Sequence, residues 1–121
     1  MPHTAGMTTP SATATTRDGR PVELARDDEG HRYTATLEGR TVAIADVAVT
    51  SELVVFTHTE TDPSVEGQGV ASTLVAWALD DVRGRGLAVL PLCPFVKAYI
   101  GRHADRYADI VYGSRTGVVH D

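Results

Sequence analysis

The chain has 121 residues, of which 42% are hydrophobic, and its 11 Lys and Arg against 16 Asp and Glu give a formal net charge of −5. This length and composition fit one compact domain. The acidic balance and the scattered cations argue against nucleic-acid binding, because a phosphate backbone requires a basic surface. The single cysteine, Cys93, excludes an intramolecular disulfide, and no Cys/His set has zinc-site spacing. We therefore expect no metal and a reducing, cytoplasmic location.

The first twenty residues contain six threonines and almost no large apolar side chain. Such a segment cannot bury enough surface to offset the entropy of ordering it, so a disordered tail is predicted over residues 1–19. The folded domain is then expected over residues 20–114, followed by a C-terminal tail over 115–121. The chain offers no apolar run of the length that a secretory signal or a membrane span requires.

Apolar and polar residues alternate from Pro21 onward, which predicts a series of half-buried strands. Turns rich in Asp, Glu and Gly separate the first strands, and glycine permits the positive φ angles that hairpins need, so an antiparallel meander is predicted. The four strands of this meander are expected around residues 22–24, 33–37, 41–49 and 52–59.

The fourth of these strands carries polar residues of chemical interest. A period of two places Val54, Phe56, His58 and Glu60 on one face of the strand. The sequence therefore predicts that His58 and Glu60 lie side by side.

The hydrophobic period changes at about Gln68. Residues 70–82, drawn at about 100° per residue, separate a polar side from an apolar side, which predicts an amphipathic helix. Gly84 and Gly86 can end this helix, because glycine accepts the left-handed conformation of a helix C-terminus.

A second helix is predicted after one more strand. Residues 87–90 form a short apolar run typical of a strand covered on both faces. Pro94 suits the first turn of a helix that extends over about residues 95–104. A short closing strand near residues 109–112 completes the predicted order.

The segment Glu66-Gly67-Gln68-Gly69-Val70-Ala71 connects the fourth strand to the first helix. Small residues in such a loop let backbone amides and a helix N-terminus converge on an anion. The Gly-Lys-Ser/Thr of a Walker loop is absent, and Ser72 stands where the dinucleotide fingerprint has its third glycine. A different kind of phosphate loop is therefore indicated.

The loop resembles the acyl-CoA loop of the GNAT superfamily of N-acetyltransferases, which reads Arg/Gln-x-x-Gly-x-Gly/Ala and here reads Glu66-x-x-Gly69-x-Ala71. Further motifs occur in the same order as in its short, single-domain YjdJ-type branch and extend the resemblance over residues 21–112: His58-Thr59-Glu60, Pro91-Leu92-Cys93-Pro94, Tyr99, Arg102-His103 and Tyr107. Glu66 departs from the general superfamily pattern but suits this branch.

The resemblance implies an α/β (α+β) fold, with a mixed, mostly antiparallel sheet and two main helices. It implies that acetyl-CoA is the acyl donor, with its pantetheine in a gap beside the fourth strand. The cofactor's pyrophosphate would lie on the loop residues, mainly on their backbone amides: Gly67, Gln68, Gly69, Val70 and Ala71. Only residues 26–30 occupy the place where other members have helices that wall the acceptor site. The acceptor side is therefore expected to be open, or to be completed by a partner or by a second copy in a homodimer.

Acetylation of an amine needs a base for the ammonium proton and an acid for the departing thiolate. Glu60 and His58 are candidates for the base, although each can equally be a solvated or structural residue. The resemblance makes Tyr99 a candidate for the acid, whereas a core aromatic role is the alternative. Cys93 before Pro94 is a candidate nucleophile at a helix N-terminus, or else a small buried hydrophobe.

Two functions remain open at this point. The first is an acetyl-CoA-dependent N-acetyltransferase that acts on an unidentified amine, either a small molecule or a protein. The second is a non-catalytic module that binds acyl-CoA or a partner. Turnover of acetyl-CoA with a panel of amines separates them, because the module would release no free thiol above the uncatalysed rate.

Overall fold

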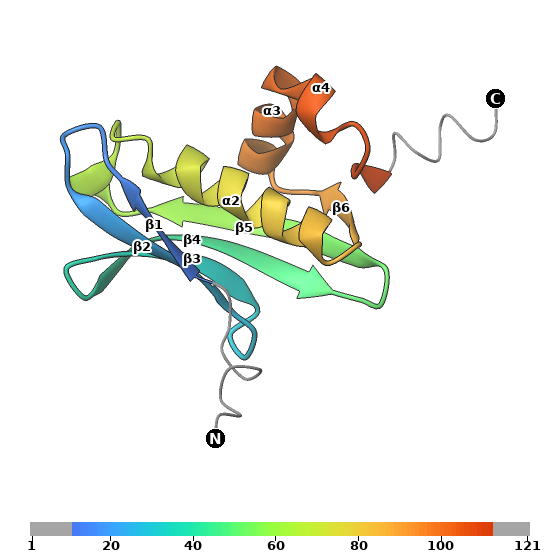
Figure 1. The fold of residues 1–121 in the computed structure, drawn as a ribbon, viewed down its shortest axis with the longest axis horizontal. Coiled ribbons are helices and arrows are strands. Elements are labelled where there is room, and N and C mark those ends of the chain that lie inside the picture. The colour runs from blue at the N-terminus through green and yellow to red at the C-terminus, as the bar shows by residue number, and fades with distance from the viewer. Residues whose placement is uncertain (1–10, 113–121) are drawn as a thin grey trace.

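The computed structural model describes residues 11–112, which form one six-stranded sheet with helices on one side (Figure 1). The strands lie in chain order, and every neighbouring pair is antiparallel except the last, β5 with β6, which is parallel. The mixed, mostly antiparallel sheet predicted from the sequence is therefore confirmed. The strands are β1 (Ser11–Thr15), β2 (Pro21–Asp27), β3 (Arg32–Leu37), β4 (Arg40–Val49), β5 (Leu53–Thr61) and β6 (Ala88–Pro91).

The helices follow the fourth predicted strand, as the change of period indicates. A short 3₁₀ turn, η1 (Pro63–Val65), leads into α2 (Val70–Gly84), which lies across the sheet. After β6 come α3 (Pro94–Arg102) and the single turn α4 (Ala104–Tyr107). Gly84 is the last residue of α2, and Gly86 follows with a φ of 74°. None of the helices in residues 11–112 combines the length and the apolar character needed to cross a membrane.

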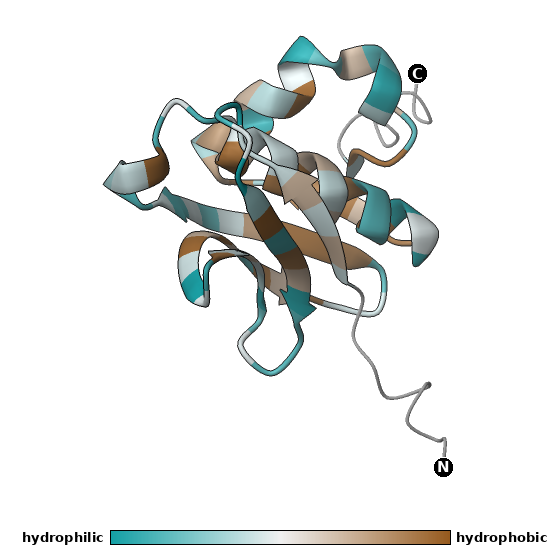
Figure 2. Ribbon diagram, turned by 60° about the vertical axis from the view of Figure 1, so that its left-hand side comes forward, coloured by the Kyte–Doolittle hydropathy of each residue, from teal (hydrophilic) through white to brown (hydrophobic). Residues whose placement is uncertain are grey.

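We call the face of the sheet that packs against α2 the covered face, and the opposite one the open face. Covered-face side chains such as Leu24, Tyr33, Ala45 and Phe56 are at most 2% exposed, and they meet the apolar side of α2. Apolar residues alternate with polar ones along the strands, whereas the turns are hydrophilic (Figure 2). Burial of the covered face supplies the main stabilisation of the fold.

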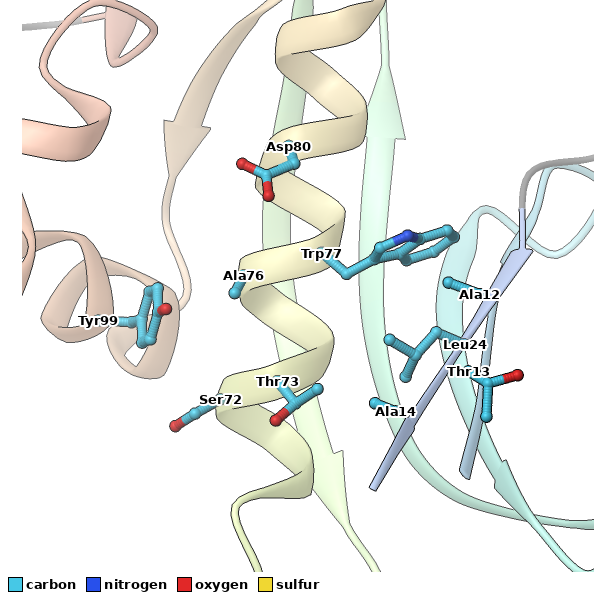
Figure 3. Close-up of a pocket in the computed structure, with 10 residues that line it drawn as sticks. All are labelled: Ala12, Thr13, Ala14, Leu24, Ser72, Thr73, Ala76, Trp77, Asp80 and Tyr99. Carbon is cyan, nitrogen blue, oxygen red and sulfur yellow. The ribbon is translucent and has the colours of Figure 1, made fainter. Parts of the chain in front are cut away.

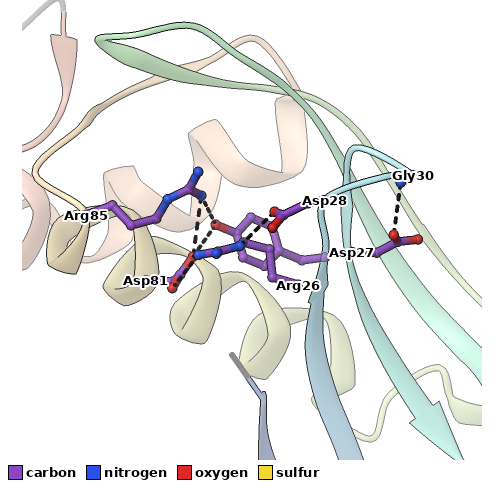
Figure 4. Close-up of polar contacts among 7 residues, drawn as sticks. Arg26, Asp27, Asp28, Gly30, Asp81 and Arg85 are labelled. Carbon is purple, nitrogen blue, oxygen red and sulfur yellow. Dashed lines mark hydrogen bonds and ion pairs between the residues drawn. The ribbon is translucent and has the colours of Figure 1, made fainter. Parts of the chain in front are cut away.

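A polar cluster under the C-terminal half of α2 fixes that helix to the sheet (Figure 4). Asp81, whose side chain is 12% exposed, accepts hydrogen bonds from the hydroxyl of Tyr33 at 2.7 Å and from Arg26 Nη1 at 2.9 Å. Arg85 Nη1 lies 3.6 Å from the same carboxylate. Burial and the bond to Asp81 raise the pKa of Tyr33 above its ordinary value. Removal of Asp81, or of a side chain that donates to it, would leave a buried polar group without its partner. The cluster therefore fixes the position of α2 on the sheet.

The N-terminal tail predicted over residues 1–19 is wrong for its second half. Residues 11–15 form β1, which pairs with the edge of β2 and half buries Ala12 and Ala14 against Leu24 and Val22. Thr16 is buried in the turn that follows, and its N–H donates to Arg20 O at 2.8 Å. The composition of the segment gave the wrong prediction because an edge strand is held by backbone pairing, which needs no large side chains. Residues 1–10 lie outside the described part of the chain.

The predicted face of the fourth strand is also wrong beyond Phe56. The register of β4 with β5 shifts there, because Phe56 pairs with Val47 and His58 pairs with Asp46, which leaves Thr57 as an inserted residue. Such a bulge reverses the alternation of the following residues. His58 and Glu60 therefore lie on the open face, whereas Val54 and Phe56 lie on the covered face.

The closing strand predicted near residues 109–112 is reduced to one bridge. Val111 pairs with Val89 in parallel, and Val89 N donates to Ile110 O at 2.8 Å. The apolar residues there do pack, since Ile110 is 5% exposed and Val111 contacts the core. The C-terminal tail predicted over residues 115–121 lies outside the described residues.

Candidate active site

The loop between β5 and α2 turns into the helix at two glycines. Asp62 caps η1 by accepting the Ser64 N–H at 2.8 Å, and hydrogen bonds from the Ser64 side chain, the Ser64 N–H and Arg40 lower the pKa of Asp62 to about 2. Gly67 and Gly69 have φ angles of 83° and 81°, in the left-handed region that side chains rarely adopt. Gly69 is also the residue that directly precedes α2. Both glycines are therefore needed for the turn into the helix.

The first turn of α2 presents unpaired amides. The helical ladder starts where Thr73 N donates to Gly69 O at 3.0 Å, so the amides of residues 69–72 have no backbone acceptor within the described chain, and no side chain caps the helix. Amides of this kind, with the helix dipole, bind anions. Gln68 differs from the other predicted cofactor residues, because its N–H already donates to Val65 O at 3.1 Å.

A gap in the sheet lies close to this loop. β5 and β6 pair only as far as Phe56 and Pro91, and Phe56 O then accepts the N–H groups of Leu92 at 3.0 Å and Cys93 at 2.9 Å. Beyond this point residues 57–61 of β5 have β4 on one side, and no strand of the described chain pairs with their other side. The sheet is thus parted beside the fourth strand of the predicted meander.

His58 and Glu60 meet on the open face. His58 Nε2 lies 2.9 Å from Glu60 Oε2, and their side chains are 54% and 67% exposed. Asp46, the register partner of His58, is ion-paired with Arg32 at 2.9 Å on the same face. The arrangement places an exposed imidazole within hydrogen-bond distance of an exposed carboxylate, and side chains of these two types act as general bases in other enzymes.

Cys93 lies on the other side of β5. It precedes α3 as its N-cap, is 3% exposed, and places Sγ 3.6 Å from Thr59 Oγ1. Thr59 pairs with Ala45 and so belongs to the covered face. Neither His58 nor Glu60 contacts this thiol, because the bulge directs both of them to the open face. The structure therefore separates the candidate nucleophile from the candidate bases.

Tyr99 lies on α3 and lines an open groove of about 410 Å³ between β1, α2 and α3 (Figure 3). Its hydroxyl points toward α2, whose first turns carry Ser72 and Thr73. Tyr99 is 7% exposed, and its ring lies 4.5 Å from that of His103 and 6.0 Å from that of Tyr107. Burial and the neighbouring Tyr99 raise the pKa of Tyr107 to about 12.

Sequence reasoning missed two residues near the loop and the gap. Thr59 was missed because side chains were assumed to alternate between the two faces along the whole of β5. The bulge changes this alternation and places Thr59 against Cys93. Arg17 lay in the segment assigned to a tail, yet its Nη1 donates to Gly67 O at 3.0 Å. An alternating Ser-Ala-Thr-Ala-Thr pattern over residues 11–15 was the available signal for the strand that positions it.

Comparison with known proteins adds the family. No curated protein matches the sequence. A similar solved structure is the ribosomal-protein-S18-alanine N-acetyltransferase from Escherichia coli, at 21% identity and a TM-score of 0.49, with 55% of this chain and 43% of that chain covered. The chain thus spans less than half the length of that enzyme. The model of the GCN5-related N-acetyltransferase family matches residues 32–110, which is more than half of the chain and includes the loop, the gap and every predicted catalytic residue. The chain therefore belongs to the GCN5-related N-acetyltransferase family.

Proposed function

We propose that this protein transfers an acetyl group from acetyl-CoA to a primary amine, as a member of the short YjdJ-type branch. The observation that carries the proposal is the parting of β5 and β6 beyond Phe56 and Pro91, next to the unpaired amides of residues 69–72. The gap offers an extended channel for pantetheine, and the amides offer a site for the pyrophosphate. The thioester would then lie within the sheet, accessible from both faces.

The two faces of the sheet supply the two halves of the reaction in this proposal. The cofactor enters from the covered side, where the loop, Cys93 and Tyr99 lie, and the amine approaches from the open face, where His58 and Glu60 lie. No helix joins β2 to β3, whose connection is a turn at residues 28–31, so the open face is accessible to a large acceptor. A partner or a second copy of the chain can complete the acceptor site there.

Transfer proceeds directly in the mechanism that the geometry favours. The His58–Glu60 pair takes a proton from the ammonium, and the free amine nitrogen attacks the thioester carbonyl carbon. The C–S bond breaks as the amide bond forms, Tyr99 donates its phenolic proton to the departing CoA thiolate, and the resulting phenolate takes up the second proton that the amine nitrogen loses. Separation of Cys93 from both bases supports this order over an acyl-enzyme on Cys93, which needs a base beside the thiol. A lone buried thiol also suits a reducing compartment such as the cytoplasm.

A Gly69→Val variant tests the cofactor site. The substitution forces a β-branched residue into a φ of 81°, so acetyl-CoA affinity measured by calorimetry should fall by more than about tenfold. Gly86→Val is the matched control, because Gly86 has a similar φ of 74° at the other end of α2 and no atom within 4 Å of its Cβ position. Equal affinity in both variants, or a wild-type protein that binds no acetyl-CoA, would contradict the site.

A non-catalytic acyl-CoA-binding module is the second candidate, and the unwalled open face favours it. An amine panel distinguishes the two candidates. The enzyme should release free CoA thiol from acetyl-CoA in the presence of at least one amine, and release should follow the amine concentration. Binding of acetyl-CoA without any thiol release above the uncatalysed rate would establish the module instead.

A further inference from the structure

The turn between β1 and β2 docks on the loop that precedes α2. Arg17 N donates to Gln68 O at 3.1 Å, and Asp18 N donates to Gln68 Oε1 at 3.1 Å. The guanidinium of Arg17 donates through Nη1 to Gly67 O at 3.0 Å. These bonds join residues 50 or 51 positions apart in the chain, so the turn has a defined place on the loop. We call residues 16–20 the docking turn.

The docking turn brings a cation to the place where the amides of α2 converge. A Cβ atom at Gly69 would lie 3.5 Å from Arg17 Nε, which puts the guanidinium beside the N-terminus of the helix. The turn uses only acceptors of the loop, namely the carbonyls of Gly67 and Gln68 and the Gln68 side chain. The amides of residues 69–72 therefore keep their donors for a ligand.

The ion pairs of the described residues leave Arg17 without a carboxylate. Arg20, in the same turn, pairs with Asp18 at 3.1 Å, whereas no Asp or Glu oxygen of residues 11–112 lies within 4.0 Å of the Arg17 guanidinium. The loop itself carries two acids, Asp62 and Glu66, and no cation. A dianionic ligand on this loop would thus meet one positive side chain nearby, and that side chain is already held in position.

We propose that Arg17 binds the pyrophosphate of the acyl-CoA, acting beside the amides of α2 as a positioned guanidinium. This inference rests on the proposed function. Arg17 precedes residues 32–110, the part that the family model matches, and it lies in the turn of the N-terminal β1–β2 hairpin. Arg suits the role because its planar donors can bond a loop carbonyl and a phosphate oxygen together.

The test measures how much of the binding affinity contributed by each phosphate group of the ligand depends on Arg17. The ligands are acetyl-CoA, its 3′-dephospho analogue and S-acetylpantetheine, with calorimetry for the nucleotides and NMR titration for the pantetheine thioester. Arg17→Gln should weaken binding of acetyl-CoA and of the 3′-dephospho analogue by the same factor, about tenfold, the effect of a charge-assisted hydrogen bond. Binding of S-acetylpantetheine should stay unchanged.

Arg20→Gln is the matched control, because it removes one positive charge from the same turn while keeping the backbone bonds of Arg20 to Thr16. Its effect on acetyl-CoA affinity should stay within about twofold. Equal losses in the two variants would reject Arg17 as a ligand. A loss that disappears with the 3′-dephospho analogue would assign Arg17 to the other phosphate and overturn the proposal.

A loss that extends equally to S-acetylpantetheine would show that the substitution acts through the fold, which also overturns the proposal. Arg17→Lys gives a second reading, since it keeps the charge and should recover part of the affinity. If wild-type protein binds acetyl-CoA and Gly69→Val does not, while Arg17→Gln binds normally, the cofactor site stands and only Arg17 is rejected. If the wild type binds no acetyl-CoA, the proposed function itself fails.

Discussion

The two halves of β5 differ in their pairing and in the face of the sheet on which their important side chains lie. Its first half, residues 53–56, pairs with strands on both sides and buries Val54 and Phe56 completely under α2. Its second half pairs on one side only, and it exposes His58 and Glu60 on the opposite face. His58 and Glu60 lie on the open face because Thr57 is inserted at a bulge, and the one-sided pairing follows from the end of β6 at Pro91. The insertion of one residue thus places the candidate catalytic groups on the open face, beyond the part of the strand that packs in the core.

The largest effect is expected from truncating the first half of β5. Phe56 has no exposed surface and stacks on Tyr33 with ring centroids 6.0 Å apart. Phe56→Ala should lower the free energy of unfolding by about 3–5 kcal/mol, the usual result of emptying an aromatic core position. Urea denaturation followed by circular dichroism measures this change.

Two adjacent valines provide a matched pair for the same comparison. Val54 is fully buried on the covered face, and Val55 is half-buried on the open face. Val54→Ala should cost about 2 kcal/mol of stability, and Val55→Ala about 1 kcal/mol or less. Equal costs would show that the two faces do not differ in packing as described.

The second half of β5 should respond in activity and hardly in stability. His58→Ala or Glu60→Gln should lower kcat by about 10² to 10⁴, the usual contribution of acid–base catalysis. Because both side chains are more than half exposed, the free energy of unfolding should change by less than about 0.5 kcal/mol. Steady-state thiol release and urea denaturation of the same samples give both values.

Cys93→Ala is the contrasting variant on the covered face. Direct transfer predicts that most of its activity is retained. Loss of turnover in this variant, parallel initial-rate plots and an acetyl group on Cys93 after mixing with acetyl-CoA alone would together reverse the mechanism. If none of these substitutions changes the rate, the non-catalytic module becomes the better description.

A smaller loss of stability is expected when the edge strand is removed. Deletion of residues 2–19 takes away β1 and the docking turn, which leaves the edge of β2 unpaired and exposes part of Leu24. The free energy of unfolding should fall by more than about 1 kcal/mol. An unchanged denaturation midpoint in the deletion variant would show that β1 adds nothing to the stability of the covered face.

The smallest effect concerns alkaline pH and the tyrosines on the covered side. The pKa of Tyr107 is raised to about 12 and that of Tyr33 is also raised, so both bind their protons more tightly in the folded state. Their contribution to stability is therefore present below about pH 10, the ordinary value for tyrosine, and is lost as the pH rises toward 12. Urea denaturation across this range should show the decline.

Tyr107→Phe isolates one part of that decline. The Tyr107 hydroxyl is buried and has no hydrogen-bond partner among the described residues, so its removal should leave stability at neutral pH nearly unchanged. The alkaline loss should be shallower in this variant. A tyrosinate absorbance titration that shows every tyrosine ionising near pH 10 in the folded protein would contradict the assignment.

The sequence by itself determined most of the secondary structure and the chemistry of the loop. Alternation over β2 to β5 and the change of period at α2 follow from which residues must face the core. The small residues from Gly67 to Ala71 indicated a loop whose backbone amides converge on an anion at the start of a helix. The residue types of the candidate site, from His58 and Glu60 to Tyr99, were also visible at this level.

Only the tertiary structure decided how these parts face one another. The bulge at Thr57 arises from pairing between β4 and β5, so no local pattern could place His58 and Glu60 on the open face or Thr59 against Cys93. β1 is held by the backbone of β2 rather than by large side chains, and composition therefore misjudged it. The position of Arg17 follows from that pairing, because contacts between distant segments depend on the whole sheet being formed.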